Sequence, residues 1–361
     1  MSMSSTSEFD IIFAGGGTTA CVVAGRLAAC EPSLKILVLE AGPCWNFAAA
    51  LTKCHRQGTL CKRAKVLDSI IAAANGADVR IVMVYTRAPA SDFDDWRVDG
   101  WESENLIPVI KKLETYEVQP DCPTHGYNGP IKVSSGGYKL SLGQELIDVG
   151  KAYHKRPYAD DTDDLETCNT YSPWAKYIDG TTGRRSDAAH HYVYNQAHNT
   201  NLQIWAGKRV IFEDKRAVGV EFTSDSVSCP DADSSSSTVR ASKLTVVSAG
   251  AFGSPTILER SGIGSEAVLK RCNIEQLVNL PGVGENYQGH QGAFAAYNIA
   301  DNVVTMDPLW RGEESAVQAK IKWRPNDDEL KAMGSAFQPR WEEFFQDRPD
   351  KAVAIFAMFV R

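Results

Sequence analysis

Residues 9–42 constrain the fold of this chain more than any other part of its sequence. A short apolar run, Ile11–Phe13, is typical of a buried parallel strand, and a glycine turn follows it at Gly15–Gly17. Residues 19–29 then place small and apolar side chains at helical spacing, and a second apolar strand ends on Glu40. This strand–turn–helix–strand order, with an acid after the second strand, predicts a dinucleotide-binding unit.

Each part of this unit has a physical reason. Gly15 lets the chain turn tightly off the strand, and Gly17 has no side chain to block a pyrophosphate that approaches the backbone. The helix that follows offers N–H groups and the positive end of its dipole to that anion. Glu40 is placed to accept hydrogen bonds from a ribose diol, and its charge disfavours the 2′-phosphate of NADP. Ala20 occupies the third glycine position. The alternative is a βαβ turn that binds no phosphate.

Composition limits the functional classes. The 361 residues suffice for two domains or one large one, and an apolar content of 43% supports a full core. A net charge of −7 speaks against nucleic acid or an anionic membrane as partner. The polar N-terminus predicts no secretory signal, and no apolar run is long enough to span a bilayer. We therefore expect an intracellular protein, cytoplasmic or peroxisomal.

The nine cysteines are scattered and lack a C-x-x-C pair, which favours free thiols in a reducing compartment. Cys54, His55 and Cys61 come nearest to a metal cluster, but adjacent residues rarely share one coordination geometry and a fourth ligand is missing. We expect no metal site.

The rest of the chain predicts further elements. Residues 44–81 fit least well and read as a basic surface excursion, with a short helix at 66–74. The acidic run 160–166 is expected to be a solvated loop. Helices are predicted at 103–117, 144–153, after 183–187 with His190 and His191, and at 256–261; strands at 131–133, 244–247 and 352–360, and an antiparallel set at 202–205, 209–212 and 218–222.

Several blocks resemble the glucose–methanol–choline (GMC) oxidoreductases, and within them most closely the fungal alcohol (methanol) oxidases. The blocks are 9–42, Tyr85–Trp96, Ile107–Tyr116, His125–Val133, Gly183–Ala189, Ser248–Pro255 with Ser261–Gly264, and Leu280–Asn286. The resemblance implies an α/β fold: an FAD-binding Rossmann-like domain with a parallel sheet, and a partial α+β substrate domain with an antiparallel sheet. We expect the first domain at 1–120 and 196–295, and the second at 125–195 and 296–361.

By this resemblance the cofactor is FAD, a primary alcohol is oxidised to an aldehyde, and dioxygen is reduced to hydrogen peroxide. The resemblance leaves open whether the chain forms an oligomer. The implied contacts are the pyrophosphate for the glycine turn, the AMP ribose for Glu40, and the adenine for the backbone of Val210. The implied cofactor-binding residues are Gly15, Gly17, Thr18, Thr19, Ala20, Glu40, Ala41, Val210, Ala249, Gly250 and Ser254.

The departures from the family pattern bear on activity. Residues 75–81 replace a family stretch that lies along the flavin, and Gly289 stands where the family has Asp. The family's catalytic His pair belongs to a C-terminal portion that this chain lacks, so no catalytic residue is assigned. We expect a C-terminally truncated member with impaired turnover. The alternatives are a working oxidase, an inactive fragment that at most binds FAD, and an NAD-binding Rossmann protein.

Overall fold

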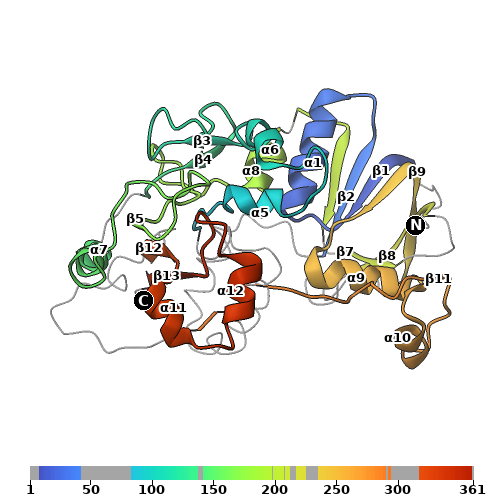
Figure 1. Ribbon diagram of the computed structural model, residues 1–361. Coiled ribbons are helices and arrows are strands. Elements are labelled where there is room, and N and C mark those ends of the chain that lie inside the picture. Colours follow the sequence, from blue (N-terminus) through green and yellow to red (C-terminus); the bar gives the residue numbers. More distant parts are fainter. Residues whose placement is uncertain are drawn as a thin grey trace, which may run out of the picture. The chain divides into compact units, whose positions relative to one another are not determined.

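The computed structural model describes residues 8–41, 83–136, 141–196, 198–206, 208–211, 217–224, 235–289, 292–293 and 317–359 (Figure 1). The chain divides into two compact units. Unit 1 is built from residues 1–77 and 188–293, and unit 2 from residues 78–187 and 294–361. The expectations for 44–81, including the helix at 66–74 and the Cys54–His55–Cys61 group, lie outside the described residues.

Unit 1 is organised around the predicted strand–turn–helix–strand, which the structure confirms. Strand β1 (Glu8–Ala14) leads into helix α1 (Thr18–Cys30), and β2 (Ile36–Glu40) returns parallel to β1. Both faces of β1 are buried. Ile11 and Phe13 pack under the small residues of α1, and Ile12 packs on the opposite face with other strands. The continuous apolar run therefore reflects a strand that is covered on both sides.

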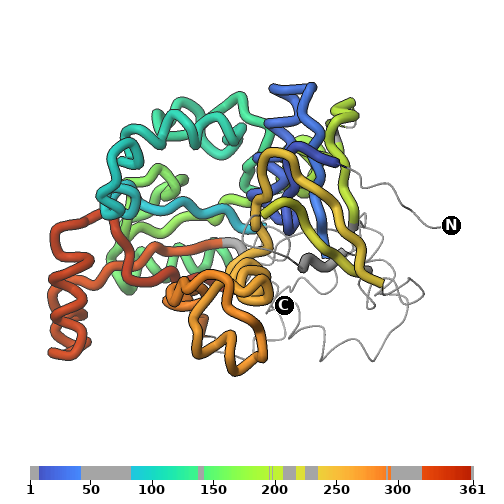
Figure 2. Tube along the Cα trace, turned by 90° about the vertical axis from the view of Figure 1, so that its right-hand side faces the viewer, coloured from blue at the N-terminus to red at the C-terminus, as the bar shows by residue number. Residues whose placement is uncertain are grey.

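The central sheet of unit 1 has the strand order β6-β2-β1-β9-β8-β7. Figure 2 shows the blue β1–β2 segment beside the yellow strand β9, which pairs parallel to β1. The outer part is antiparallel, as expected, with β7 bonded to β8 and β8 to β9. The strands not yet bounded are β6 (Leu202–Ala206), β7 (Lys208–Ile211), β8 (Gly219–Ser224) and β9 (Ser237–Val247).

Strand β6 departs from the prediction. The sequence placed 202–205 in an antiparallel set, but β6 pairs parallel with β2, with Ile36 opposite Leu202. The position of the chain segment that precedes β6 explains this direction. Helix α8 (Ala188–Tyr192) packs on α1, so the chain enters the sheet beside β2 and in the same direction. The contact is close, because a Cβ on Gly25 would lie 2.1 Å from the Tyr192 carbonyl oxygen.

The rest of unit 1 follows β9. Helix α9 begins at Gly250 rather than at Thr256, because the small residues from 250 onward form its first turns. The smaller elements are η1 (Tyr194–Gln196), α9 (Gly250–Arg260), β10 (Ile263–Gly264), α10 (Glu266–Arg271) and β11 (Val278–Asn279).

Unit 2 contains the expected antiparallel sheet, in the order β13-β12-β5, with helix α7 against it. Its apolar core includes Ile147, Tyr171 and Ile321. The predicted helix 103–117 is wrong beyond Ile110, because 114–116 form strand β3, which pairs with β4. The elements are α5 (Ala90–Asp94), α6 (Ser103–Ile110), β3 (Glu114–Tyr116), β4 (Ile131–Val133), α7 (Ser141–Tyr153), β5 (Tyr171–Pro173), β12 (Val317–Trp323), α11 (Asp327–Met333), α12 (Gln338–Phe344) and β13 (Ala354–Phe359).

The division into units differs from the expected domain boundaries at two places. Residues 188–195 were expected in the second domain, whereas they belong to unit 1, where helix α8 packs on α1. Residues 83–120 were grouped with the N-terminal domain, whereas the structure packs them into unit 2. Backbone and side-chain bonds explain this. The Tyr85 N–H donates to Ala175 O at 2.8 Å, and the Trp174 indole donates to Tyr85 O at 2.8 Å. In the ranges that the structure describes, no helix has the length and apolarity needed to cross a membrane.

Candidate functional site

Three strands of unit 1 end at one edge of the sheet. Ala14 of β1 lies opposite Leu39 of β2 and opposite Val247 of β9. The turn after β1, the acid Glu40 after β2, and the turn after β9 therefore meet at this carboxyl edge. In open α/β sheets this is the edge at which ligands bind.

The turn at Gly15 requires glycine. Its φ is +109°, and a Cβ there would lie 2.5 Å from the Ser248 carbonyl oxygen and 2.6 Å from the Ala249 Cα. Bonds fix the turn from both sides. The Gly15 N–H donates to Leu39 O at 2.8 Å, and the Ser248 hydroxyl donates to Gly15 O at 2.8 Å. The tight turn predicted at Gly15 is confirmed.

Gly17, unlike Gly15, has free space where a Cβ would lie. It is the N-cap of α1, with φ −70° and ψ −175°, and a Cβ there would meet only the Ser248 carbonyl oxygen, at 4.0 Å. Gly17 has no side chain that could cap the helix, and the first turn of α1 holds no acid. Thr18 and Thr19 are exposed, whereas the Ala20 methyl is buried against the strands. The helix start thus presents backbone N–H groups and an uncompensated positive dipole end.

Glu40 has a structural partner that sequence reasoning missed. Its Oε2 accepts a hydrogen bond of 2.7 Å from the Gly16 N–H, which ties the end of β2 to the glycine turn. Gly16 sits so close that a Cβ there would lie 3.0 Å from the same oxygen. The position of the acid is thereby fixed beside the start of α1. Ala41, the next residue, is exposed.

The third strand brings its own turn to the edge. After β9 the Ala249 N–H donates to the Ser254 hydroxyl at 3.0 Å, and Gly250 has a φ of +82°. The structure therefore brings the predicted residues of the first turn, of β2 and of α9 together. Val210 lies in β7, at the end of the strand order, where it pairs with Phe222.

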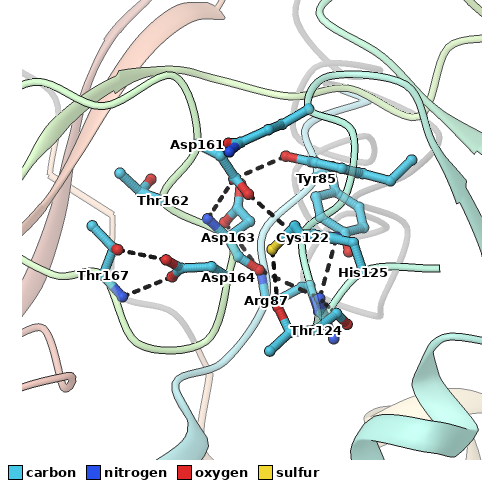
Figure 3. A network of polar contacts seen from close by, with 12 residues as sticks. Tyr85, Arg87, Cys122, Thr124, His125, Asp161, Thr162, Asp163, Asp164 and Thr167 are labelled. Atoms are coloured by element: carbon cyan, nitrogen blue, oxygen red, sulfur yellow. Dashed lines mark hydrogen bonds and ion pairs between the residues drawn. The ribbon is translucent and has the colours of Figure 1, made fainter. Parts of the chain in front are cut away.

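Unit 2 holds a second polar cluster that the sequence did not predict (Figure 3). His125 is fully buried between two carboxylates, with Nδ1 2.9 Å from Glu114 Oε1 and Nε2 3.1 Å from Asp161 Oδ2. Its ring stacks on Tyr116 with centroids 3.6 Å apart. Beside it, the Lys320 ammonium contacts both Asp163 oxygens at 2.6 and 2.7 Å. These carboxylates pair with buried cationic groups inside unit 2.

The acidic run 160–166 was expected to be solvated, and this is wrong for two of its members. Asp161 is 8% exposed and Asp163 1% exposed. Their charges are compensated by residues far away in the sequence. Lys320 and Lys322 lie in β12, and their ammonium groups reach 2.6 and 3.1 Å from Asp163. No local pattern around residue 160 signals this burial.

The cluster shifts the ionisation of its members. Burial alone would raise the pKa of Asp161, but hydrogen bonds from His125 and the Asp163 backbone outweigh it and lower this pKa to about 2. Burial would lower the pKa of His125, and the Asp161 and Glu114 carboxylates reverse this and raise it. The cluster therefore favours ionised carboxylates with positive charge between them.

Comparisons with known proteins place the chain among flavoenzymes. Residues 9–292 match the family described as GMC oxidoreductase. Alcohol oxidase of Candida boidinii is 34% identical over 99% of this chain and 60% of its own length. The oxygen-dependent choline dehydrogenase of Burkholderia lata is 30% identical over 82% of this chain and 55% of its own.

Solved structures agree on the fold. Formate oxidase of Aspergillus oryzae superposes with a TM-score of 0.69 at 17% identity, covering 95% of this chain and 66% of that one. Pyridoxine 4-oxidase from Mesorbium loti superposes with a TM-score of 0.58 at 25% identity, covering 76% and 55%. The chain spans 60% of the length of the alcohol oxidases it matches.

Proposed function

Because this chain belongs to the GMC oxidoreductase family, whose cofactor is FAD, we propose that unit 1 binds the ADP half of FAD at the carboxyl edge of its sheet. We further propose that the chain acts in the oxidation of CH–OH groups. The observation that carries the proposal is the open backbone at Gly17, at the start of an uncapped helix and beside a fixed acid.

The residues at this edge fit a dinucleotide. The N–H groups of Gly17, Thr18, Thr19 and Ala20 begin α1 and would hold the pyrophosphate, because the first four N–H groups of a helix have no partner within it. For Ala20 this contribution comes from the backbone, since its methyl is buried. Glu40 would accept hydrogen bonds from the ribose diol while its bond to Gly16 holds it in place.

The second turn would complete the adenosine side. Ala249 and Gly250 lie at the end of β9, and the Ser254 hydroxyl bonds the Ala249 N–H, which fixes the backbone there. Val210 would contribute its backbone to the adenine, and Ala41 lies next to the ribose-binding acid. Unit 2, with its antiparallel sheet, is proposed as the substrate-binding part.

When bound, FAD supplies an acceptor for the hydride of the substrate carbon, and its reduced form is reoxidised by dioxygen. The alcohol oxidase relatives favour a primary alcohol as substrate, so that alcohol and dioxygen give aldehyde and hydrogen peroxide. A base must take the hydroxyl proton. In the part of the chain that the structure describes, we assign no residue to this role, because the buried His125 is enclosed by carboxylates.

Cofactor binding is tested by titrating the purified chain with FAD and following the flavin absorbance and fluorescence. ADP should compete with FAD, whereas NADP, whose 2′-phosphate the Glu40 charge repels, should not. Preferential binding of NAD would favour the Rossmann alternative, and absence of FAD binding would overturn the proposal. Peroxide release with methanol or ethanol measures the proposed oxidation of CH–OH groups separately from FAD binding.

Gly17→Asp separates binding from folding. Asp is a favoured N-cap residue, and the extended backbone and open space at Gly17 accept its side chain. Its charge, however, would occupy the pyrophosphate position and repel the anion. We expect unchanged or slightly higher thermal stability and loss of FAD binding. The neutral Gly17→Asn is the matched control of similar size, and it should weaken binding less. Unaltered FAD affinity in Gly17→Asp would contradict the assignment of this turn.

A further inference from the structure

The peptide group between Gly15 and Gly16 is held at both ends by side chains from other strands. Its N–H, which belongs to Gly16, donates to Glu40 Oε2 at 2.7 Å, at the end of β2. Its carbonyl oxygen, which belongs to Gly15, accepts a hydrogen bond of 2.8 Å from the hydroxyl of Ser248, directly after β9. Because the N–H and the C=O of a trans peptide point in opposite directions, these two bonds together fix the orientation of the peptide plane.

A peptide between two glycines needs such support. Neither residue has a Cβ, so both can adopt backbone conformations that other residues avoid, and the peptide between them can turn over at little steric cost. A reversed peptide would aim the Gly15 carbonyl oxygen at the Glu40 carboxylate, and two acceptors repel each other. It would also displace the start of α1, whose free N–H groups would receive the pyrophosphate. The peptide must therefore keep one orientation for the anion to bind well.

Ser248 suits this task by its chemistry and by its position. Its hydroxyl donates, as a carbonyl oxygen requires, whereas an ionised Glu40 only accepts, as an N–H requires. The Ser248 main chain is anchored to β1, because its N–H donates to Ala14 O at 2.8 Å. The bond from its hydroxyl to Gly15 is partly buried, which limits competition from water. Ser248 thus holds the carbonyl end of the peptide from a fixed point.

The hydroxyl of Ser248 acts on the turn rather than on the sheet. Strands β1 and β9 already pair along their length, up to Ala14 opposite Val247. The bond from the Ser248 N–H to Ala14 O continues this backbone ladder by one step, and it does not involve the side chain. Removing the hydroxyl should therefore leave the pairing of the two strands intact and loosen only the Gly15–Gly16 peptide.

We propose that Ser248 is a positioning residue for the pyrophosphate of the cofactor, an inference that rests on the function proposed above. Its hydroxyl holds the Gly15–Gly16 peptide in the orientation that preorganises the start of α1, and Ser248 itself need not touch the ligand. Preorganisation acts on affinity, because only molecules whose turn has the binding-competent orientation bind the ligand at full strength. Loss of one such hydrogen bond should weaken the binding of a diphosphate ligand by about 3- to 10-fold.

The first test needs no cofactor. Hydrogen exchange of the full chain, followed by NMR at the Gly16 amide, should be faster in Ser248→Ala than in the unmodified chain, because the peptide is then held at one end only. Ser261→Ala is the matched control, since that hydroxyl also donates to a backbone carbonyl, Ile257 O at 2.7 Å, but at the end of α9. It should leave the Gly16 amide unchanged. Unaltered exchange at Gly16 in Ser248→Ala would overturn the proposal, whether or not the chain binds FAD.

The second test measures binding, with ADP and adenosine as competitors of FAD in a fluorescence titration. Ser248→Ala should bind ADP about 3- to 10-fold more weakly and keep its affinity for adenosine, which has no phosphate. Ser261→Ala should bind both ligands like the unmodified chain. Equal losses for ADP and adenosine would indicate general damage to this edge and refute the positioning role, as would an unchanged ADP affinity. An unmodified chain that binds neither FAD nor ADP would instead contradict the proposed function.

Discussion

Replacing Gly15 by Ala tests whether the turn after β1 depends on the absence of a side chain. The new Cβ would lie 2.5 Å from Ser248 O and 2.7 Å from Ala249 N, and these are backbone atoms that no side-chain rotation can move. A φ of +109° in a non-glycine residue costs about 1–3 kcal/mol. Forcing the β9–α9 turn outward adds about 1–3 kcal/mol. We expect unit 1 to lose about 2–6 kcal/mol of its free energy of unfolding.

The measurement is thermal and urea unfolding of the full chain by circular dichroism, without cofactor. A loss of that size lowers the melting temperature of a unit this large by on the order of 10 °C. Gly17→Ala is the matched control, since its Cβ would meet only one atom, at 4.0 Å. It should unfold like the unmodified chain. Equal stability of Gly15→Ala and Gly17→Ala would refute the account of the turn.

Two further predictions concern packing and pH. Gly25→Ala should lower the free energy of unfolding by about 1–3 kcal/mol, because its Cβ would lie 2.1 Å from Tyr192 O and push α8 off α1. Denaturant unfolding measures this loss, and an unchanged stability would contradict the close packing of the two helices. Burial would raise the pKa of Asp95, but hydrogen bonds from Lys351 and Arg348 lower it overall. A lowered carboxyl pKa stabilises the fold above the unfolded value of 3.8, and this stabilisation is lost as the pH falls through the folded value. Unfolding curves between about pH 6 and 2 should show a weaker acid dependence for Asp95→Asn, and identical slopes would exclude the contribution.

The sequence predicted best those features that local residues determine. The β1–α1–β2 unit follows from apolar runs, from a glycine that must adopt a positive φ, and from small residues under the helix, all within 9–42. The sequence predicted that β6 is a strand, but it did not predict that β6 runs parallel to its neighbour. A strand's own residues do not encode whether its partner runs parallel, and here the packing of α8 on α1 decides it.

The polar cluster escaped prediction for a similar reason. Strand β12 alternates Ala319 and Ile321 with Lys320 and Lys322, a pattern typical of one buried and one solvated face. Both faces are buried, because Asp163 receives the two ammonium groups. Neither an acidic run nor an alternating strand reveals that it will meet the other across the sequence. The cofactor-binding roles at the carboxyl edge of unit 1 stay predictions until the titrations are made.

The ion pair between Asp163 and Lys320 also sets an order of events during synthesis. The two residues are 157 positions apart, so Asp163 leaves the ribosome long before the lysine that neutralises it exists. Until β12 emerges, the first segment of unit 2 holds a carboxylate that it cannot bury without a cation, and it must wait incompletely folded. The need for this pair therefore makes the completion of unit 2 a late step of translation. Slowing the ribosome between the codons of Asp163 and Lys320 should prolong the period in which the nascent chain depends on chaperones.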